Sequence, residues 1–358
     1  MARMTRPGFR GWVMGILECR VHRPEPCRGD RQFVSAYEAF KIQRAKPITA
    51  PRKPKALRPG SKVAVFAPAS PAEQLEVTAG LAELRRLGYE FTPVQFPGCE
   101  GYFAGSTPAR LDAFVKAARH PEIAALFALR GGYGATYLLD HNLAAQLLEP
   151  KCVIGYSDLT SLQTYLWQMC GWVTFHGPMV TAGLNRGADD ARGYDEDSLL
   201  QAVGNANSGW ELPLFGKTLV KGVAEGRLLG GCLTLLQTTI GTPWELDTSG
   251  AILVLEDRAM RPYQADRALM HLKQAGKLQG VHGVIVGEFP DSDPPVKGSP
   301  SVQDVCERIL SPLGVPVVFG ASIGHTQRPM LTIPFGVRAR LIASADGRLE
   351  ILEPAVTA

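Results

Sequence analysis

From Ser61 onward, short apolar segments alternate with longer segments that have helical spacing. KVAVFAPA (62–69), IAALFAL (123–129) and CVIG (152–155) have the composition of buried strands. Each is followed by a stretch with apolar residues three or four positions apart, and short glycine-containing turns join these segments. Strands that alternate with helices in this way predict a parallel sheet covered by helices on both faces. FTPVQF (91–96) is predicted as a further strand of this sheet.

A second α/β region follows a polar segment. Residues 182–221 are rich in Gly, Asn and Asp, so we interpret them as the crossing between two domains. Beyond them, AILVLE (251–256) and GVIVGEF (283–289) are strong strand segments separated by a helical stretch. The last segment, 330–353, alternates around an Asp-Gly turn, which predicts antiparallel strands. The predicted organisation is an N-terminal α/β domain (57–181), an interdomain linker (182–221) and a C-terminal α/β domain (222–358).

Charge is divided unevenly along the chain. Residues 1–60 hold 14 Lys and Arg against 4 Asp and Glu, whereas the remaining 298 residues hold 24 against 30. The stretch 1–56 has many Arg and Pro and no sustained hydrophobic period, which favours a disordered leader. A secretory signal is disfavoured, because the apolar patch 12–17 is short and no small-residue cleavage site follows it. A nucleic-acid-binding arm fits the charge, but no motif supports it, so no nucleic acid is expected as a partner.

Composition argues against several other classes of protein. No run approaches the roughly 18 consecutive apolar residues that span a bilayer, so no membrane partner is expected. The seven cysteines are an odd number and widely scattered, which argues against a disulfide framework and predicts a reducing compartment, the cytoplasm. No CxxC pair and no His/Cys cluster with zinc spacing occur, so neither a metal nor a cofactor is expected.

The ends of the predicted strands are where function is expected. Ligands of an open parallel sheet gather beyond the carboxyl ends of its strands. Four of these ends carry polar or glycine-rich groups, namely 130–134 (RGGYG), 155–158 (GYSD), 256–258 (EDR) and 324–325 (GH).

Ser157 lies where the CVIG strand turns into a helix. A serine at a helix start is commonly an N-cap, whose hydroxyl accepts a hydrogen bond from the first turn. The functional alternative is a nucleophile elbow, in which a strained turn exposes the hydroxyl and the next backbone N–H stabilises an oxyanion. The usual elbow pattern is G-x-S-x-G, and here Leu159 holds the fifth position. Position alone favours the N-cap, and both alternatives stay open.

A nucleophilic serine needs a base and an orienting carboxylate. His176 and His325 both follow strands in glycine-containing loops, and either one could instead be a structural histidine. Glu256 ends an apolar strand, where the simpler explanation is an ion pair with Arg258 or Arg261. The RGGYG turn lacks the pattern of a phosphate loop, but its double glycine offers free backbone N–H groups for an oxyanion hole.

Eight sequence blocks follow one another along the chain, namely LRPGSKVAVFAPASP, GYFAGSTPARL, ALFALRGGYGA, VIGYSDLTSL, TFHGPM, LLGGCLTLLQTTIGTPWE, ILVLEDRAMRPYQADRAL and IGHTQRPMLTIPFGVRARL. In this order they resemble the LD-carboxypeptidase family of serine peptidases, the muramoyltetrapeptide carboxypeptidases. The resemblance spans about residues 57–353, and the main departure is Cys232, where a polar residue is more usual.

The resemblance implies a catalytic apparatus. The implied triad is Ser157 as nucleophile, His325 as base and Glu256 as its carboxylate. The backbone N–H groups of Asp158 and of Gly131 or Gly132 are the implied oxyanion hole. The substrate presents a carboxylate, so an arginine in the cleft is expected, and Arg258, Arg261 and Arg328 lie near predicted catalytic loops. Arg258 and Tyr133 are our predicted substrate contacts.

The resemblance also implies a fold and a substrate. The family fold is a flavodoxin-like N-terminal domain with a smaller C-terminal α/β domain, and here the latter has a β-rich end. Homodimers are usual in the family. The implied substrate is a murein peptide that loses its terminal D-alanine during cell-wall recycling in the cytoplasm.

Two rival hypotheses are considered. An immunity-type relative would hydrolyse peptidyl-nucleotide antibiotics and would need an aromatic residue, such as Trp244 or Tyr133, to stack on the base. A non-catalytic two-domain binding protein is disfavoured, because all three members of the implied triad are present.

Overall fold

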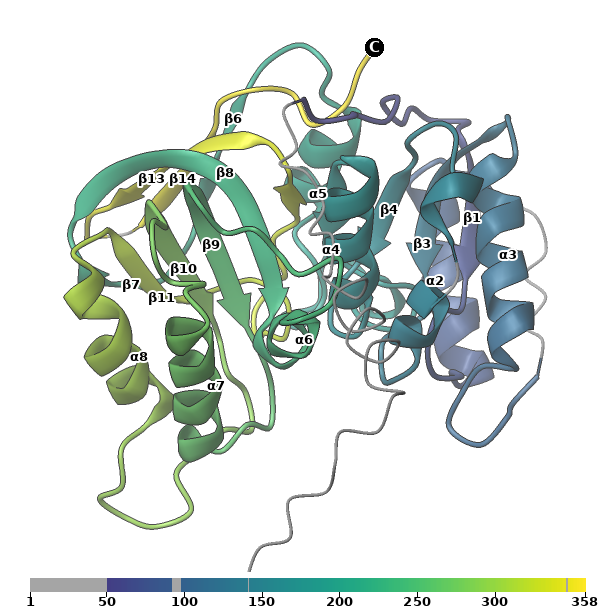
Figure 1. Cartoon of the computed structure of the whole chain (residues 1–358). Helices are drawn as coiled ribbons and strands as arrows, with labels where there is room; N and C mark the ends of the chain where they lie inside the picture. Colours follow the sequence, from purple (N-terminus) through teal and green to yellow (C-terminus); the bar gives the residue numbers. More distant parts are fainter. Residues whose placement is uncertain (1–49, 92–97, 141, 346) are drawn as a thin grey trace, which may run out of the picture. The chain divides into compact units, whose positions relative to one another are not determined.

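The computed structural model describes residues 50–91, 98–140, 142–345 and 347–358 (Figure 1). All of them belong to the compact unit Arg44–Ala358. Two sheets flanked by helices make up this unit, so the predicted α/β class is confirmed. The predicted leader up to residue 49, and residues 92–96 of the predicted strand, lie outside the described residues.

The first sheet has the strand order β12-β5-β4-β3-β1-β2. Its five N-terminal strands are parallel in the flavodoxin-like order 2-1-3-4-5, which confirms that prediction. β12 comes from the far end of the chain and pairs antiparallel with β5. The strands are β1 (Lys62–Phe66), β2 (Glu90–Phe91), β3 (Ile123–Ala128), β4 (Cys152–Gly155), β5 (Thr174–His176) and β12 (Ile333–Phe335).

Helices cover both faces of this sheet. Successive side chains along β3 point to opposite faces of the sheet. Phe127 packs in the hydrophobic cluster on one face, and Leu126 packs in the cluster on the other face. Two 3-10 helices, η1 (Ala135–Asp140) and η2 (Ala144–Gln146), follow β3. The first face carries α2 (Gln74–Arg86) and α5 (Glu196–Gly204), and the second carries α3 (Thr107–Arg119) and α4 (Leu159–Cys170).

The second sheet has the order β6-β14-β13-β8-β9-β10-β11-β7. Its central strands β8 to β11 are parallel, and antiparallel strands flank them on both sides. The strands are β6 (Trp210–Pro213), β7 (Lys217–Val220), β8 (Gly222–Cys232), β9 (Ala251–Glu256), β10 (Gly283–Gly287), β11 (Val317–Ala321), β13 (Arg338–Ala343) and β14 (Arg348–Ile351). The helices α6 (Leu233–Thr239), α7 (Pro262–Gln274) and α8 (Val302–Leu310) pack on it, and the short 3-10 helix η4 (Ser311–Leu313) follows α8.

Burial and local capping explain why these segments adopt these structures. Every residue of β9 is buried, as expected for a central parallel strand covered on both faces. At α8, Ser301 Oγ accepts from Asp304 N and the Asp304 carboxylate accepts from Ser301 N, which is a capping box. A buried cluster runs without interruption from Val63 in the first sheet to Val254 in the second, so the two sheets share a core.

The polar segment 182–221, predicted as a linker, contributes to both sheets. It contains α5, which packs on the first sheet, and β6 and β7, which form the two edges of the second sheet. With these two edge strands, the second sheet has eight strands among the described residues, and the first sheet has six. The exact domain boundaries stay a prediction.

Residues 50–56 belong to the predicted leader, yet they pair with the body. Arg52 N donates to Gly171 O at 2.7 Å, and Val173 N donates to Arg52 O at 3.0 Å. Ala56 N donates to Thr357 O, and Thr357 N donates to Pro54 O, each at 2.8 Å. Composition did not reveal this pairing, because it satisfies backbone groups and uses no apolar pattern.

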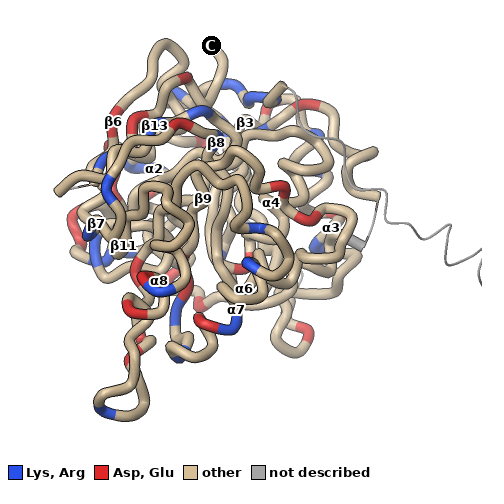
Figure 2. The backbone as a smooth tube through the Cα atoms, turned by 60° about the vertical axis from the view of Figure 1, so that its left-hand side comes forward, with Lys and Arg blue, Asp and Glu red and all other residues tan. Residues whose placement is uncertain are grey.

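Lys and Arg positions are interspersed with Asp and Glu positions along the described chain (Figure 2). Many form local pairs, such as Glu225 with Arg338 and Arg340 at 3.1 and 2.7 Å. Such exposed pairs contribute little to stability.

Candidate active site

Ser157 lies in a sharp turn between β4 and α4. Its φ is 63°, in the left-handed region that a non-glycine residue adopts only when the surrounding structure holds it there. A Cβ placed on Gly155 would come within 2.5 Å of the Leu159 side chain. Glycine at that position therefore lets the helix pack close to the strand. This strand–turn–helix geometry is that of a nucleophile elbow.

The N-cap alternative for Ser157 does not fit the structure. Asp158 occupies the cap position of α4, and Ser157 adjoins it one residue earlier. Within the described part of the chain, the Ser157 hydroxyl receives no hydrogen bond from the first turn of the helix. The half-buried hydroxyl is thus not used for capping.

The RGGYG turn packs directly on Ser157. A Cβ on Gly131 would lie 2.9 Å from Ser157 Cβ, 3.0 Å from its Oγ and 3.4 Å from Asp158 N. Gly132 has a φ of 104°, and a Cβ there would meet Ser70 Oγ at 2.3 Å. Both glycines are therefore required sterically, and the turn backbone lies beside the serine hydroxyl and the Asp158 amide.

Two buried charged groups anchor this turn. Asp158 Oδ2 accepts from Ala135 N at 2.7 Å, and Arg110 Nη1 donates to Gly134 O at 2.9 Å. Arg110 is only 2% exposed and also donates to Gly105 O and to Pro68 O, so it connects three loops. Burial raises the pKa of Asp158 to about 6, although the Ala135 N–H and the Arg110 charge oppose this effect.

Glu256 and His325 meet where β9 and β11 end. Glu256 is fully buried, and its Oε2 lies 2.7 Å from His325 Nδ1 and accepts from the His325 backbone N–H at 2.9 Å. A Cβ on Gly324 would lie 2.3 Å from the Glu256 carboxyl carbon, so glycine is required there. Burial raises the pKa of Glu256, but the charge of His325 and the contacts with both neighbouring histidines outweigh it. The pKa therefore lies well below its ordinary value.

His176 is a second histidine beside Glu256. It is fully buried, and its Nε2 lies 3.5 Å from Glu256 Oε1, which is long for a hydrogen bond. Neither ring nitrogen, nor that carboxylate oxygen, has a hydrogen-bond partner among the residues that the structure describes. Sequence reasoning considered His176 only as a possible base or a loop residue. The available signal was its place at the end of the strand next to the Ser157 strand.

Several contacts bring the predicted triad to one region. The ring of Tyr156, next to Ser157, lies 4.9 Å from the His325 ring between centroids. Cys232 N donates to Thr160 Oγ1 in the first turn of α4 at 3.0 Å, and Cys232 pairs in register with Glu256. In the described structure the Ser157 hydroxyl and the His325 ring do not hydrogen bond, and such contacts are often loose without substrate.

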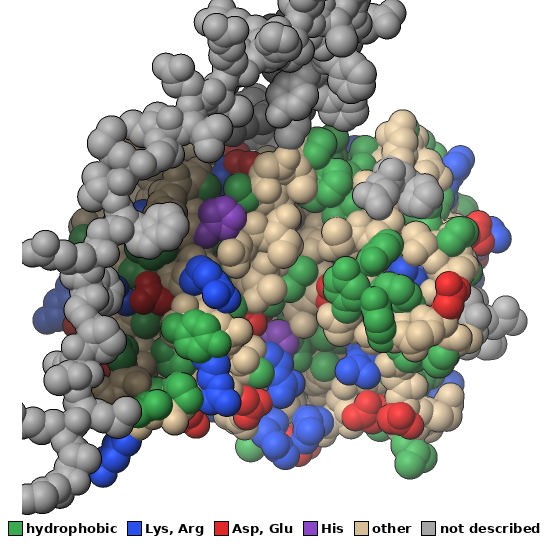
Figure 3. Space-filling model, turned by 60° about the horizontal axis from the view of Figure 1, so that its bottom comes forward, with side chains coloured by type: hydrophobic (Ala, Val, Ile, Leu, Met, Phe, Trp, Pro, Cys, Tyr) green, Lys and Arg blue, Asp and Glu red, His purple; other side chains and the backbone are tan. Residues whose placement is uncertain are grey.

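A cleft of about 370 Å³ opens at His325 and Tyr156. Arg186, Arg192 and Arg258 are its cationic lining residues. Figure 3 shows the face seen from the bottom of Figure 1, where Lys and Arg side chains gather near a histidine in the lower half.

Of the two predicted substrate contacts, Arg258 lines the cleft and Tyr133 does not. Arg258 pairs with Asp291 at 2.9 Å, not with Glu256. Tyr133 does not line the cleft, but lies in an exposed aromatic cluster with Tyr102, Phe103 and Tyr137. Trp244 packs on Tyr165, with ring centroids 5.5 Å apart.

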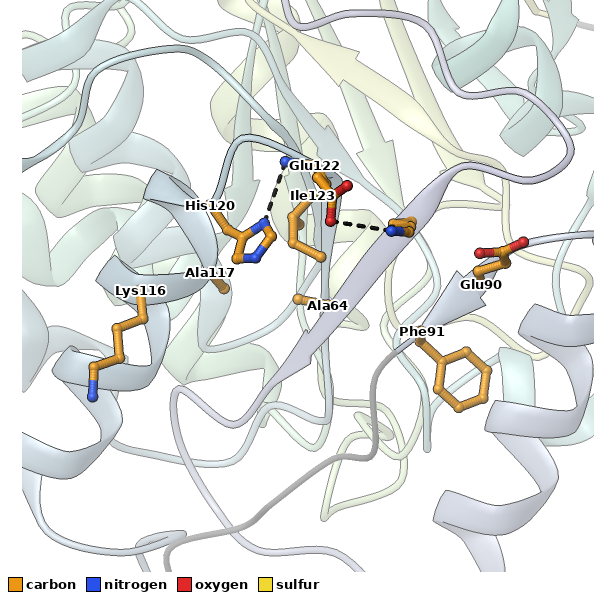
Figure 4. A pocket seen from close by; sticks show the side chains of 9 residues that line it. Ala64, Glu90, Phe91, Lys116, Ala117, His120, Glu122 and Ile123 are labelled. Atoms are coloured by element: carbon orange, nitrogen blue, oxygen red, sulfur yellow. Dashed lines mark hydrogen bonds and ion pairs between the residues drawn. The ribbon is translucent and has the colours of Figure 1, made fainter.

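A second cavity, of about 360 Å³, lies at the opposite edge of the first sheet, where β1 and β3 begin (Figure 4). Several of its polar and charged groups already have local partners. Lys62 pairs with Glu122 at 3.1 Å, and His120 Nδ1 accepts from Glu122 N at 3.2 Å. It contains no serine and no buried carboxylate–histidine pair, so the cleft at His325 is the better candidate.

Two further findings concern the part of the chain that the structure describes. No group of three or more His, Cys, Asp or Glu side chains could hold a metal ion there. No helix in that part has both the length and the apolar character to cross a membrane.

Comparison with known families defines the class of the protein. The LD-carboxypeptidase N-terminal domain matches residues 63–177, and the LD-carboxypeptidase C-terminal domain matches residues 225–341. These matches identify a serine-type peptidase. The chain belongs to the LD-carboxypeptidase family and is an enzyme of that family, as the sequence blocks predicted.

Named relatives agree with this assignment. The chain is 37% identical over 295 residues to a probable murein peptide carboxypeptidase from Bacillus subtilis (strain 168), covering 81% of this chain and 91% of the relative. It is 30% identical over 273 residues to a murein tetrapeptide carboxypeptidase from Pseudomonas aeruginosa, covering 74% and 88%.

Solved structures share the fold. A muramoyltetrapeptide carboxypeptidase from Oxalobacter formigenes superposes with a TM-score of 0.72 at 29% identity, covering 82% of this chain and 99% of that one. The microcin C7 self immunity protein MccF superposes with a TM-score of 0.79 at 22% identity, covering 86% and 100%. At that lower identity the likeness concerns the fold alone.

Proposed function

We propose that this enzyme releases terminal D-alanine from murein tetrapeptides, with Ser157, His325 and Glu256 as its catalytic triad. The observation that carries the proposal is the buried Glu256–His325 pair, whose histidine lines a cleft beside the Ser157 elbow. The names of the two murein carboxypeptidase relatives support the substrate.

The histidine is oriented for proton transfer. Glu256 has a depressed pKa and is therefore ionised, so it accepts the Nδ1–H of His325. This hydrogen bond leaves Nε2 unprotonated and able to take the proton of the Ser157 hydroxyl. The fixed carboxylate then stabilises the imidazolium that forms.

The reaction proceeds through an acyl-enzyme. Ser157 Oγ bonds to the scissile carbonyl carbon, and the carbonyl oxygen becomes an oxyanion. The backbone N–H groups of Asp158 and of Gly131 or Gly132 stabilise this oxyanion, supported by the close packing of the turn on Ser157. His325 gives its proton to the departing amine of D-alanine, and the C–N bond breaks. Water, deprotonated by His325, then hydrolyses the ester and restores Ser157.

The cellular setting is also part of the proposal. We infer a cytoplasmic enzyme of cell-wall recycling, supported by the five described cysteines, none of which forms a disulfide. A homodimer is what the family resemblance implies, and sedimentation of the full chain would measure it.

The test is release of D-alanine from a purified murein tetrapeptide by the full chain, measured by mass spectrometry. Ser157→Ala should lower turnover by several orders of magnitude with unchanged circular dichroism. Ser249→Ala, an exposed serine whose hydroxyl makes no hydrogen bond among the described residues, is the matched control. Wild-type turnover by Ser157→Ala would refute the triad.

The immunity-type activity remains the second candidate. The observation that favours it is the exposed ring of Tyr133 on the turn that packs against Ser157, because such a ring could stack on a nucleobase. Parallel digestion of a murein tetrapeptide and a peptidyl-nucleotide separates the two candidates. Hydrolysis of the nucleotide conjugate alone would overturn the murein assignment.

A further inference from the structure

Three arginines line the cleft at His325, and their environments differ. Arg258 Nη2 is bound to Asp291 Oδ2 at 2.9 Å. The side chains of Arg186 and Arg192 make no ion pair and no hydrogen bond with any described residue. Both are exposed. The cleft therefore contains two guanidinium groups available to a ligand.

Arginines elsewhere near the site are already engaged. Arg328 donates to Glu288 Oε1 at 2.5 Å and to Phe215 O at 2.9 Å, so binding a ligand would require breaking these bonds. Arg261 donates to Asp293 O at 3.4 Å and does not line the cleft.

The segment that carries the two arginines is anchored at both ends. Arg186 ends the 3-10 helix η3 (Leu184–Arg186), and Leu184 is buried in the core that the two sheets share. Beyond Arg192, Gly193 O accepts from Met330 N at 3.2 Å, close after His325. The backbone of this segment is thereby tied to the segment that carries the proposed base, which positions both side chains relative to it.

The remaining polar groups of the cleft suit a peptide end. Asn185 Oδ1 is buried in the cleft lining without a hydrogen-bond partner in the described structure, so a ligand N–H would satisfy it. Glu76 is the acidic lining residue outside the Arg258–Asp291 pair, and one carboxylate against two guanidinium groups leaves an excess of positive charge. Guanidinium groups match carboxylates through paired, charge-assisted hydrogen bonds.

We propose that Arg186 and Arg192 bind the C-terminal carboxylate of the peptide substrate. This inference rests on the proposed function and assigns a role to residues that the sequence placed in a linker. The two arginines would hold the substrate's C-terminal carboxylate at a fixed distance from His325. This distance limits how many substrate residues can follow the scissile bond. The pair thus makes the enzyme an exopeptidase, since a longer or amidated end would leave both charges unpaired.

The experiment compares two peptides, the murein tetrapeptide and the same peptide with a C-terminal carboxamide. In the double variant Arg186→Gln/Arg192→Gln, kcat/KM for the free-acid peptide should fall about 10- to 100-fold, mainly because KM rises. It should then be close to the kcat/KM of the wild type for the amidated peptide. Activity on the amide should stay unchanged. Arg186→Lys/Arg192→Lys keeps the charges but loses the planar fork, so it should recover only part of the loss.

Control variants and a binding measurement keep the outcomes separate. Arg119→Gln removes an exposed arginine at the end of α3, away from the cleft, and should behave as wild type. Calorimetric binding of both peptides to Ser157→Ala, with and without the two glutamines, measures recognition without turnover. If the double variant keeps the wild-type preference for the free acid in turnover and in binding, the inference is wrong. If the wild type cleaves neither peptide, the proposed function is wrong. The calorimetric binding measurement then still tests whether the two arginines recognise the carboxylate.

Discussion

One carboxylate oxygen of Glu256 holds His325 at two points, the ring Nδ1 at 2.7 Å and the backbone nitrogen at 2.9 Å. The ring and the main chain of the histidine are therefore fixed relative to the end of β9. Because Glu256 is fully buried, water does not compete for this oxygen. An exact placement of the imidazole follows from two hydrogen bonds, not one.

Replacing Glu256 by Gln should lower kcat by roughly 10³- to 10⁴-fold, since a neutral amide neither fixes the tautomer nor stabilises the imidazolium. KM should change little, because Glu256 does not line the cleft. Steady-state kinetics on the tetrapeptide measure both constants. Glu225→Gln, which loses an exposed carboxylate paired with arginines, is the control. Near-normal kcat in Glu256→Gln would exclude Glu256 as the triad carboxylate.

His176→Phe should lower kcat/KM roughly tenfold, since it removes the group nearest Glu256 Oε1 while filling the same space. Acid unfolding, followed by circular dichroism, should also move to higher pH, because the stability that ionised Glu256 contributes is lost once it is protonated. Burial raises the pKa of Glu256, and without the imidazole of His176 to oppose this effect, the carboxyl becomes protonated at a higher pH.

The groups around His176 define the control for this prediction. The ionisable residues beside His176 are Glu256 and Tyr156, which lies on the adjacent turn. Phe335 packs on the ring of His176. His176→Gln, which keeps a polar N–H group near the carboxylate, should return acid unfolding toward its wild-type pH. Identical acid-unfolding profiles for wild type and His176→Phe would mean that His176 only fills space.

Asp158→Asn should make the protein more stable at neutral pH. Burial raises the pKa of Asp158 from 3.8 to about 6, so the folded state binds the proton more tightly than the unfolded state. The contribution of Asp158 to wild-type stability is therefore most favourable at low pH and falls, by up to about 3 kcal/mol, as pH rises from 4 to 6. The amide still accepts from Ala135 N without this charge penalty.

Thermal unfolding of both proteins between pH 4 and 8 measures the Asp158 effect. The difference in Tm should widen from pH 4 to about 6 and stay constant above. A difference independent of pH would show that ionisation of Asp158 does not couple to folding.

Gly131→Ala should reduce kcat about 10²-fold, because the new methyl group would come within 3.0 Å of Ser157 Oγ and displace the turn from the oxyanion position. Gly204→Ala is the matched control, since its Cβ would meet only Leu57 O, at 3.3 Å. Unaltered turnover in Gly131→Ala would place the oxyanion hole elsewhere.

The sequence predicted the parallel sheet and the strand ends well, because alternating apolar segments and glycine turns are local signals. Ser157 was ambiguous, since the incomplete elbow pattern hides that Gly155 makes room for the bulky Leu159. His176 could not be distinguished from a loop residue, because its interaction with Glu256 joins residues from different sheets.

Other features were invisible for a similar reason. Arg186 and Arg192 lie in a polar segment with no periodic pattern, and only the folded chain brings them to the cleft at His325. The last strands were predicted as antiparallel, and β13 and β14 do pair in that way. The sequence did not indicate that β12 pairs with the first sheet, because an edge strand of three residues is too short to show a hydrophobic pattern.

The position of β12 has a consequence for biosynthesis. The other strands of its sheet are complete in the nascent chain long before β12 leaves the ribosome, so β5 meanwhile presents an unpaired edge. The segment that later covers this edge begins just after His325. Closure of the sheet and synthesis of the proposed base thus belong to one late stage of translation. If His325 is the base, a nascent chain that has not closed its sheet is also inactive.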